Sequence, residues 1–298
     1  MTSITLLDGS IGQELVKRAG DRPTPLWSTQ IMIDHPKLVG EVHLDYFKSG
    51  ATVATTNTYA VLRDRLLRAG LEERFEALTE AALLSARRAR AAHGGGRVAG
   101  AIGPIGASYR PDLAPPPEEA ARIYAETVAL MKGQVDLLLI ETVSSLRQAE
   151  GALLACSGHG LPVWLALCVD ETDGTKLRSG EPLSDIAPLV DRFAPDALCV
   201  NCSPPEVVGA GLDVLARMGK PFGAYANGFR TISEGFLQDA PTVAALDARR
   251  DLGPEAYARF VMGWIAQGAT IVGGCCEIGP AHIEELSRQI TEAEHEII

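Results

Sequence analysis

Short apolar runs recur along the chain, and nearly all of them end in polar or glycine-containing residues. Several are apolar at consecutive positions, as in "VDLLLIET", and strands of this kind are buried on both faces in parallel sheets. Eight runs can be counted, at residues 4–9, 51–57, 97–103, 135–142, 163–170, 197–203, 222–228 and 269–276. The pattern therefore predicts eight buried strands.

Helix-like segments separate these runs. The segment "GPEAYARFVMGWIAQG" has Pro254 near its start and ends on Gly268, the punctuation expected of a helix. Eight strands alternating with helices predict an α/β fold, a (β/α)8 TIM barrel that forms a single domain over residues 1–298. A doubly wound open sheet is the alternative. The usual nucleotide fingerprints, GxGxxG after the first strand and Walker A, are absent from the sequence.

Two long connections contain glycine and proline and follow the third and seventh predicted strands. They cover residues 106–119 and 227–251. Loops in these positions would lie at the carboxyl-terminal face of the barrel, where substrates bind.

Composition and charge exclude several classes of partner. The net charge of −11 argues against binding to nucleic acid, because phosphates need a basic surface, and against an anionic membrane surface. The start of the chain shows no signal peptide, and no run reaches the ~18 apolar residues of a membrane span. We expect a cytoplasmic protein whose six cysteines are reduced.

Chemically capable residues collect at the predicted carboxyl ends of the strands, which carry the active site in this fold. In chain order these residues are Asp8, Asn57, Glu141, Asp170, Cys202, Asn227, Cys275 and Cys276.

The motif "GGCCE" places two adjacent thiols at the end of the eighth run, and it permits a disulfide, a redox dithiol or a metal site. A disulfide between neighbouring cysteines is strained. Cys202 ends the sixth run, so it converges with Cys275 and Cys276 over one mouth of the barrel. Three thiolates suit a soft tetrahedral metal, with zinc the leading candidate, and they leave a fourth position open as in catalytic sites.

The remaining cysteines are expected to have other roles. Residues three apart in a strand point to opposite faces, so Cys199 should face the helix layer if Cys202 faces the site. Cys156 and Cys168 are expected to be packing residues. Gly273 and Gly274 are expected to let the backbone turn so that both following thiols reach inward.

A zinc ion with three thiolate ligands is suited to binding a fourth thiol. Free thiols have a pKa near ~8.5, so only a small fraction is ionised at neutral pH, whereas a coordinated thiol is deprotonated. The natural reaction is attack by the substrate sulfur on an activated alkyl group.

The motifs "LLDGS", "TNTY", "LLIET", "VNCS" and "VGGCC" resemble the homocysteine S-methyltransferases, and the resemblance covers essentially the whole chain. It implies a barrel enzyme that uses zinc to methylate homocysteine to methionine. By position it implies that Cys202, Cys275 and Cys276 are the zinc ligands. It also implies that Asp8 and Glu141 hold the amino group of homocysteine, and an ammonium in a cleft favours carboxylates. Asp8 has an alternative role as a cap on the following helix.

The methyl donor is expected to be a small cation such as S-methylmethionine, S-adenosylmethionine or a betaine-like compound. Trp27 and Tyr59 could contact it through cation–π interactions, although ordinary packing is an alternative for Trp27. Asn57 and Asn227 are further candidates for substrate binding.

The chain departs from the family pattern where the donor should be recognised. Glu277, Ile278 and Gly279 stand where members that use S-methylmethionine usually have Arg-Thr-Thr, and Thr142 stands where members that use betaine have an aromatic residue. The alternative function is a thiol-binding module with another small thiol or selenol as acceptor, or with a corrinoid protein as methyl donor. The sequence leaves the oligomeric state open between a monomer and a small homo-oligomer.

Overall fold

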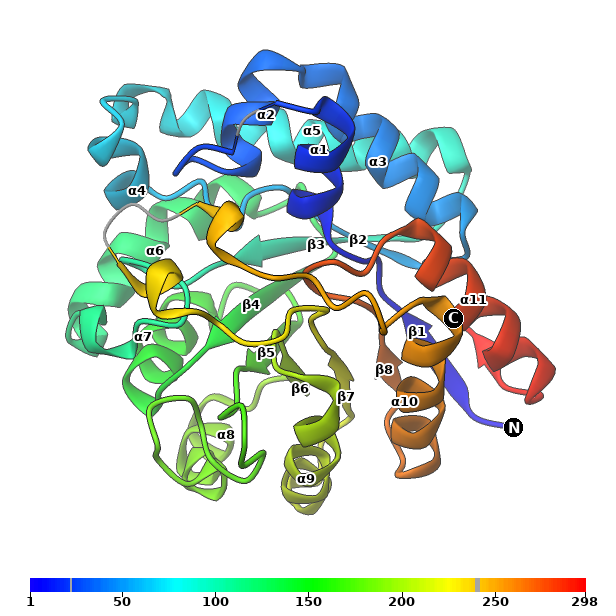
Figure 1. Ribbon diagram of the computed structural model, residues 1–298. Coiled ribbons are helices and arrows are strands. Elements are labelled where there is room, and N and C mark those ends of the chain that lie inside the picture. The colour runs from blue at the N-terminus through cyan, green and yellow to red at the C-terminus, as the bar shows by residue number, and fades with distance from the viewer. Residues whose placement is uncertain (22, 239–241) are drawn as a thin grey trace.

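Nine parallel strands form the centre of the computed structural model, which describes residues 1–21, 23–238 and 242–298 (Figure 1). The strands are β1 (Ser3–Leu6), β2 (Val53–Thr55), β3 (Arg97–Ile102), β4 (Leu137–Val143), β5 (Val163–Leu167), β6 (Ala197–Asn201), β7 (Phe222–Tyr225), β8 (Ile271–Val272) and β9 (Glu296–Ile297). The first eight correspond to the eight predicted runs, although each strand is shorter than its run. Most of the polar run ends belong to loops, whereas β4 keeps Glu141 and Thr142. The ninth strand was not predicted.

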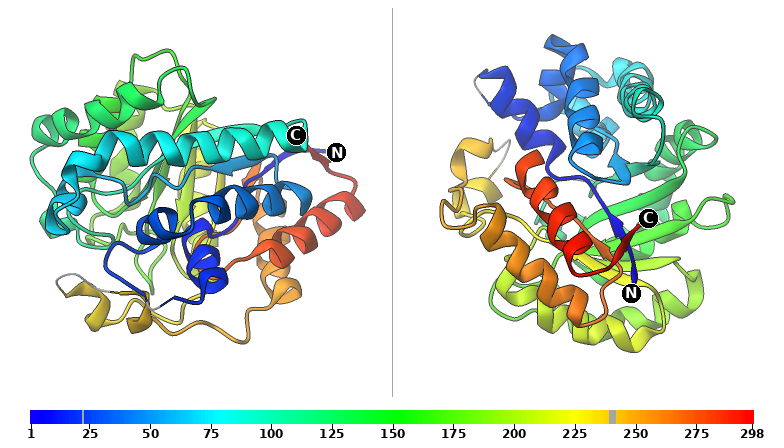
Figure 2. Two further views of the ribbon diagram at one scale, coloured as in Figure 1. Left: turned by 90° about the horizontal axis from the view of Figure 1, so that it is seen from above. Right: turned by 90° about the vertical axis from the view of Figure 1, so that its right-hand side faces the viewer.

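Helices cover the outside of the sheet (Figures 1 and 2). They are α1 (Ile11–Ala19), α2 (Ser28–Asp34), α3 (Pro36–Lys48), α4 (Arg63–Arg68), α5 (Phe75–His93), α6 (Pro117–Met131), α7 (Leu146–Cys156), α8 (Ala187–Phe193), α9 (Pro205–Leu215), α10 (Pro254–Ala266) and α11 (Pro280–Glu292). Several begin at a proline, whose fixed φ suits the first helical position. Ser10 and Ser145 cap α1 and α7 by accepting a hydrogen bond from a backbone N–H of the first turn.

The strand order is β2-β3-β4-β5-β6-β7-β8-β1-β9, and the sheet curls until β2 at one end meets the end of β1 near the other. On one edge of β1 the start of the strand pairs with β9, in the register Ile4 to Ile297. Further along, Leu7 forms an isolated parallel bridge with Val53 of β2. We call this junction of β1, β2 and β9 the seam.

The predicted α/β architecture is confirmed, but the prediction of a closed eight-stranded barrel is not. The structure is a curled, barrel-like sheet of nine strands whose ladder is interrupted at the seam. The physical reason is that β9 takes hydrogen-bonding positions beside the start of β1, and β2 reaches β1 only through a single bridge.

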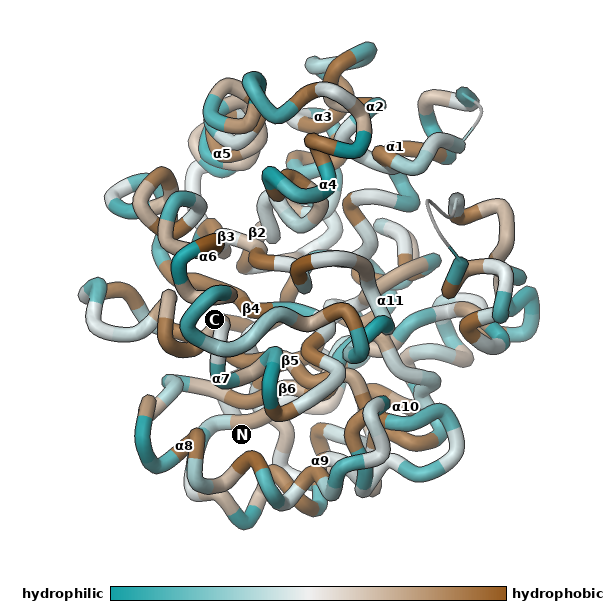
Figure 3. The backbone as a smooth tube through the Cα atoms, turned by 90° about the vertical axis from the view of Figure 1, so that its left-hand side faces the viewer, coloured by the Kyte–Doolittle hydropathy of each residue, from teal (hydrophilic) through white to brown (hydrophobic). Residues whose placement is uncertain are grey.

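Apolar side chains pack against both faces of the sheet, in one cluster inside it and another outside it. An inner cluster takes side chains from each of the strands β1 to β8 or the residue after it, and includes Leu7, Val53, Leu139, Trp164 and Ile271. A larger outer cluster lies between the sheet and the helices. Apolar residues accordingly run through the strands, whereas many of the polar residues lie on the helices and loops at the periphery (Figure 3). In the part of the chain that the structure describes, no helix has the length and apolar character of a bilayer span.

Candidate metal and substrate site

A pocket of about 450 Å³ opens at the carboxyl ends of the strands. It brings together most of the residues predicted for the site, namely Asp8, Trp27, Asn57, Tyr59, Glu141, Cys202, Cys275 and Cys276. Asn227 does not line it. Both predicted loops contribute to its walls, through Tyr109 from the first and Phe229, Phe236 and Leu246 from the second. Residues 239–241 of the second loop lie outside the described residues.

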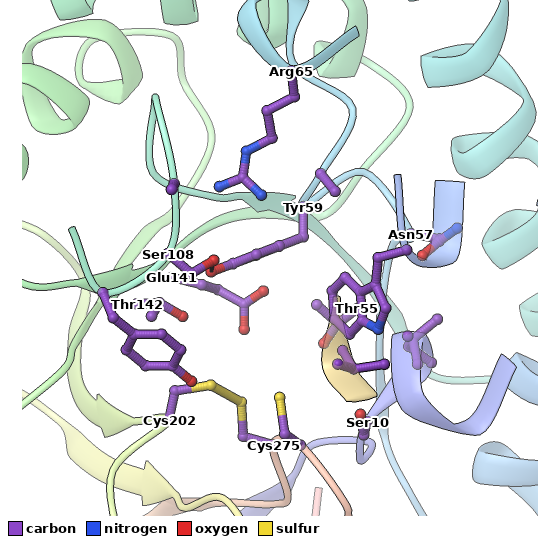
Figure 4. Close-up of a pocket in the computed structure, with 18 of the residues that line it drawn as sticks. Ser10, Thr55, Asn57, Tyr59, Arg65, Ser108, Glu141, Thr142, Cys202 and Cys275 are labelled. Atoms are coloured by element: carbon purple, nitrogen blue, oxygen red, sulfur yellow. Dashed lines mark hydrogen bonds between the residues drawn. A yellow bond between two sulfur atoms is a disulfide. The ribbon is translucent and has the colours of Figure 1, made fainter. Parts of the chain in front are cut away.

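The three predicted thiols meet in the pocket, and Figure 4 shows two of them, those of Cys202 and Cys275. The sulfur atoms of Cys202, Cys275 and Cys276 all lie within 4.8 Å of one another. Cys202 and Cys275 are joined in a disulfide with a Cα–Cα distance of 5.6 Å, whereas Cys276 is free. The expectation that all six cysteines are reduced is therefore wrong for this form of the molecule. The strained pairing of the adjacent cysteines is indeed avoided, because the bond joins two different strand ends.

An unusual backbone conformation aims the first of these thiols into the pocket. Cys202 follows β6 directly and has a φ of 48°. Its carbonyl oxygen accepts a hydrogen bond of 3.0 Å from Nδ2 of Asn227, which is buried. Asn227 thus holds the loop that carries Cys202, from behind the pocket wall.

The two glycines that precede the adjacent Cys275 and Cys276 are needed because a larger side chain would not fit at either position. Neither Gly273 nor Gly274 has a positive φ, contrary to the expectation that they turn the backbone. A Cβ at Gly273 would lie 2.6 Å from Cβ of Leu7, and one at Gly274 would lie 2.2 Å from Cγ2 of Ile278. The glycines let this loop pack closely against β1 and against the turn that follows.

The prediction that Cys199 faces the helix layer is wrong. Its side chain belongs to the inner cluster, below the site. The alternation argument fails because Cys202 lies beyond the end of β6 with positive φ, so its direction does not follow from strand periodicity. The metal-capable group contains Cys202, Cys275 and Cys276 and does not include Cys199.

The other two cysteines are buried and free, as packing residues should be. Cys156 ends α7. Cys168 lies one residue beyond β5, and its Sγ lies 3.5 Å from the carbonyl oxygen of Cys202.

Asp8 joins β1 to β2 at the inner edge of the pocket. Its Oδ2 accepts a hydrogen bond of 2.6 Å from the backbone N–H of Thr55, and its Oδ1 accepts one of 2.7 Å from the Thr55 hydroxyl. Ser10, and not Asp8, caps the following helix. Burial raises the pKa of Asp8 well above its usual value, and the nearby charge of Glu141 adds to the rise.

Glu141 presents a second buried carboxyl group to the same pocket. Its side chain is buried, and burial raises its pKa to about 7, while the hydroxyl of Tyr225 favours the charged form. Two neighbouring carboxyls with raised pKa values are suited to binding a cation, which would stabilise their ionised forms.

An irregularity in β4 follows Glu141, which alternation with Leu137 and Leu139 of the inner cluster already places on the inner face. The register with β5 shifts between Ile140 and Val143, and Thr142 has a φ of 59°. The backbone N–H of Thr142 donates to Oδ1 of Asn201 at 3.0 Å, and Nδ2 of Asn201 donates to the Thr142 hydroxyl at 3.3 Å. Bulges of this kind redirect side chains at active sites, and Asn201 holds this one from β6.

Aromatic side chains form the wall above the carboxyl groups. The rings of Trp27 and Tyr59 meet edge to face with centroids 6.1 Å apart. Nε1 of Trp27 donates to Gln13, which in turn donates to Glu277 at 2.5 Å. The hydroxyl of Tyr59 lies 2.8 Å from that of Ser108. Hydrogen bonds thus fix both rings, and one of these chains reaches the residue after Cys276.

Asn57 lies at the pocket wall, but its amide is directed toward α2. Its Nδ2 donates to the carbonyl oxygen of Ser28 at 3.3 Å. This hydrogen bond gives the buried amide a partner within the protein. Substrate binding by Asn57 stays a prediction.

Several residues that line the pocket or support its wall were not found from the sequence. Arg65 lies on α4, Gln13 on α1, and neither belongs to a motif at a strand end. Asn201 immediately precedes Cys202, so the "VNC" motif offered a signal that was not used.

The pocket combines three sulfur atoms, which are soft metal ligands, with two carboxyl groups that could bind a cation. Three sulfur atoms at these mutual distances could hold a metal ion once the disulfide is reduced, since metal-bound cysteines are thiolates. The buried carboxyls of Asp8 and Glu141 could bind an ammonium group. The pocket could therefore hold a substrate that carries both a thiol and an amine.

Comparison with known proteins agrees with this chemistry. The family model for homocysteine S-methyltransferase matches residues 5–290. A homocysteine S-methyltransferase of Escherichia coli strain K12 is 30% identical over 304 residues, covering 95% of this chain and 94% of that protein.

Two solved structures are also similar along their full length. The metallated form of the homocysteine methyltransferase MmuM from Escherichia coli has a TM-score of 0.81 at 28% identity, covering 97% of this chain and 96% of that one. Its oxidized form has a TM-score of 0.80 at 28% identity, covering 96% of each chain. Together with the thiols and carboxyls that meet in one pocket, the match over residues 5–290 shows that the chain belongs to the homocysteine S-methyltransferase family.

Proposed function

We propose that this protein is an enzyme that transfers a methyl group from a small cationic donor to the thiol of homocysteine, giving methionine. The observation that carries the proposal is the meeting of three cysteine sulfurs and two buried carboxyls in one pocket. The family match over nearly the whole chain supports it.

The donor set fits a zinc ion held by Cys202, Cys275 and Cys276. The three sulfurs are mutually close, come from two strand ends, and are the soft ligands that zinc accepts. When bound, zinc would supply Lewis acidity that keeps the substrate thiol ionised at neutral pH. Because the thiols must be reduced for this, we propose that the protein works in the cytoplasm.

The other pocket residues orient the two substrates. Asp8 and Glu141 bind the ammonium group of homocysteine, and Trp27 and Tyr59 contact the onium centre of the donor. The substrate sulfur attacks the donor methyl carbon. A new sulfur–carbon bond forms as the bond to the donor heteroatom breaks, the bonding pair stays on the departing sulfide or amine, and the thiol proton goes to solvent.

The partners that we propose are these small molecules. The net charge of −11 gives no support for a nucleic-acid partner. The chain over residues 1–298, with its barrel-like sheet, is proposed to act as one catalytic domain.

The test is a measurement of zinc content and of methionine formation. We expect about one zinc per chain after reduction and reconstitution, and little zinc in protein kept oxidised. Reduced, zinc-loaded protein should form methionine from homocysteine and at least one of S-methylmethionine, S-adenosylmethionine or glycine betaine. Full zinc loading without methionine from any of these donors would contradict the proposed reaction.

A further inference from the structure

A guanidinium group enters the pocket at the end away from the cysteines. Arg65 extends from α4 toward Tyr59, while Cys202 and Cys275 lie on the far side of Glu141 (Figure 4). The pocket thus has carboxyl groups and sulfurs at one end and a permanent positive charge at the other.

Arg65 is held in place, but no described carboxylate neutralises its positive charge. Its Nη2 donates to the carbonyl oxygen of Pro104 at 2.7 Å, and its guanidinium lies 5.5 Å from the centroid of the Tyr59 ring. Its Nε is buried and has no hydrogen-bond partner among the described residues. No described carboxylate forms an ion pair with it, in contrast to Arg178 on the same face, which lies 3.2 Å from Glu171.

A fixed guanidinium with an unused donor is a site for a planar anion. Arginine binds carboxylates through parallel N–H donors, and a buried donor that lacks a partner is costly until a ligand supplies one. The orientation of Arg65 is set by Pro104 and Tyr59, so little conformational freedom would be lost when an anion binds.

The pocket must hold two substrates in about 450 Å³. That volume is within the ~300–1,000 Å³ usual for one drug-sized ligand, so both substrates have to be small. Space therefore favours a compact donor such as S-methylmethionine or a betaine over S-adenosylmethionine.

We propose that Arg65 binds the carboxylate of the methyl donor, and that the donor is a compact zwitterion whose onium group lies against Trp27 and Tyr59. This inference rests on the proposed function, because it assigns one substrate of that reaction. Homocysteine is the weaker candidate for Arg65, since its carboxylate and ammonium share one carbon atom. An acceptor whose ammonium contacts Asp8 and Glu141 keeps its carboxylate at that end of the pocket.

The test compares donors with and without a carboxylate in the zinc-loaded, reduced enzyme. Binding is measured by calorimetry, and methionine formation is measured separately. The pairs are glycine betaine with tetramethylammonium, and S-methylmethionine with (3-aminopropyl)dimethylsulfonium. Arg65→Met should weaken binding of the carboxylate donor by about 10- to 100-fold, as expected for hydrogen bonds to a charged group. It should leave binding of the matched analogue nearly unchanged.

The control is Arg63→Met, which removes an arginine from the same helix outside the pocket, where it pairs with Glu126. It should leave donor binding unchanged. Arg65→Lys should restore part of the affinity, which a purely structural role of the guanidinium would not predict.

Three results would overturn the assignment. The first is equal binding of carboxylate donors by wild type and Arg65→Met, including no binding by either. The second is an equal loss for donors with and without the carboxylate. The third is a loss of affinity confined to homocysteine and absent for 3-aminopropanethiol, which would assign Arg65 to the acceptor. If binding depends on Arg65 but no methionine forms, the binding site stands and the proposed reaction fails.

Discussion

Backbone conformations that are rare for side-chain-bearing residues gather around the pocket. Among the described residues, seven other than glycine have positive φ, and four of these line the pocket, namely Trp27, Tyr109, Thr142 and Cys202. A fifth, Glu277, follows Cys276. Such conformations cost of order 1–3 kcal/mol each and persist where the surroundings enforce them. The concentration of strain at one mouth supports a function there.

Replacing single cysteines tests the proposed ligand set. Cys202→Ser, Cys275→Ser and Cys276→Ser should each abolish tight zinc binding, because a soft thiolate is lost from a group of three. Cys199→Ser is the control, since that side chain belongs to the inner cluster below the site. Zinc per chain, measured on reduced protein, gives the answer. Loss of zinc in the control would show that the ligand set is wrong.

The raised pKa of Glu141 should appear in the stability of the protein. Its folded pKa of about 7 lies above the usual 4.5, so the folded state retains a proton that the unfolded state releases. Stability falls between these pH values as the pH rises. Glu141→Gln should therefore gain about 3 kcal/mol of unfolding free energy relative to wild type from pH 4.5 to 7.

Urea unfolding of both proteins in the same metal state measures this difference. The gain should level off above pH 7, where Glu141 is ionised in both states. A difference that does not change with pH would mean that burial does not raise this pKa. The variant should also bind homocysteine more weakly while keeping zinc, because the carboxylate proposed to bind the ammonium is gone.

At the scale of elements, the bulge in β4 depends on a residue of β6. Asn201→Ala removes both hydrogen bonds that hold Thr142 in its strained conformation. We expect the homocysteine KM to rise about tenfold, because Thr142, the neighbour of Glu141, loses its support, with zinc binding retained. Asn201→Asp keeps the acceptor for the Thr142 N–H and should lie between wild type and Asn201→Ala. An unchanged KM in Asn201→Ala would show that the bulge holds without Asn201.

The elements themselves were largely predictable, because eight apolar runs correspond to eight strands. Their register was not. The shift of β4 against β5 coincides with hydrogen bonds from Thr142 to Asn201 of β6, 59 positions away in sequence. The direction of Cys199 was missed for a different reason, since periodicity describes residues inside a strand and says nothing of Cys202 just beyond it. The short β9 carries too few residues to show a pattern.

For the whole molecule, the sequence predicted which residues converge because strand ends share one face in this architecture. That reasoning found the thiols and both carboxyls. It could not find Arg65, which lies on α4 and not at the end of a strand. The chain ends also join the sheet in a way that no local pattern indicates, since β9 pairs with β1.

A buried histidine should limit the stability of the whole fold in acid. His43 on α3 is fully buried, neither ring nitrogen has a hydrogen-bond partner among the described residues, and burial lowers its pKa to about 4. The unfolded state takes up a proton below pH 6.5, whereas the folded state does not until about pH 4. Stability from this residue is present above pH 6.5 and is lost as the pH falls to 4.

His43→Leu should remove that loss. Relative to wild type, its unfolding free energy should improve by about 3 kcal/mol between pH 7 and pH 4. Urea unfolding at several pH values measures it. Parallel stability curves for the two proteins would show that His43 does not titrate with this shift.

Asp8 has a structural role at the seam in addition to the binding role proposed for it. Its carboxylate accepts both hydrogen bonds from Thr55, so it fastens β2 to β1 where the ladder is reduced to a single bridge. An ammonium that arrives at Asp8 would favour the ionised form of its carboxyl group, which accepts those same bonds better than the protonated form does. Binding of homocysteine at Asp8 would then hold β2 more firmly to β1. The amide proton of Thr55 would exchange with solvent more slowly whenever the pocket is filled.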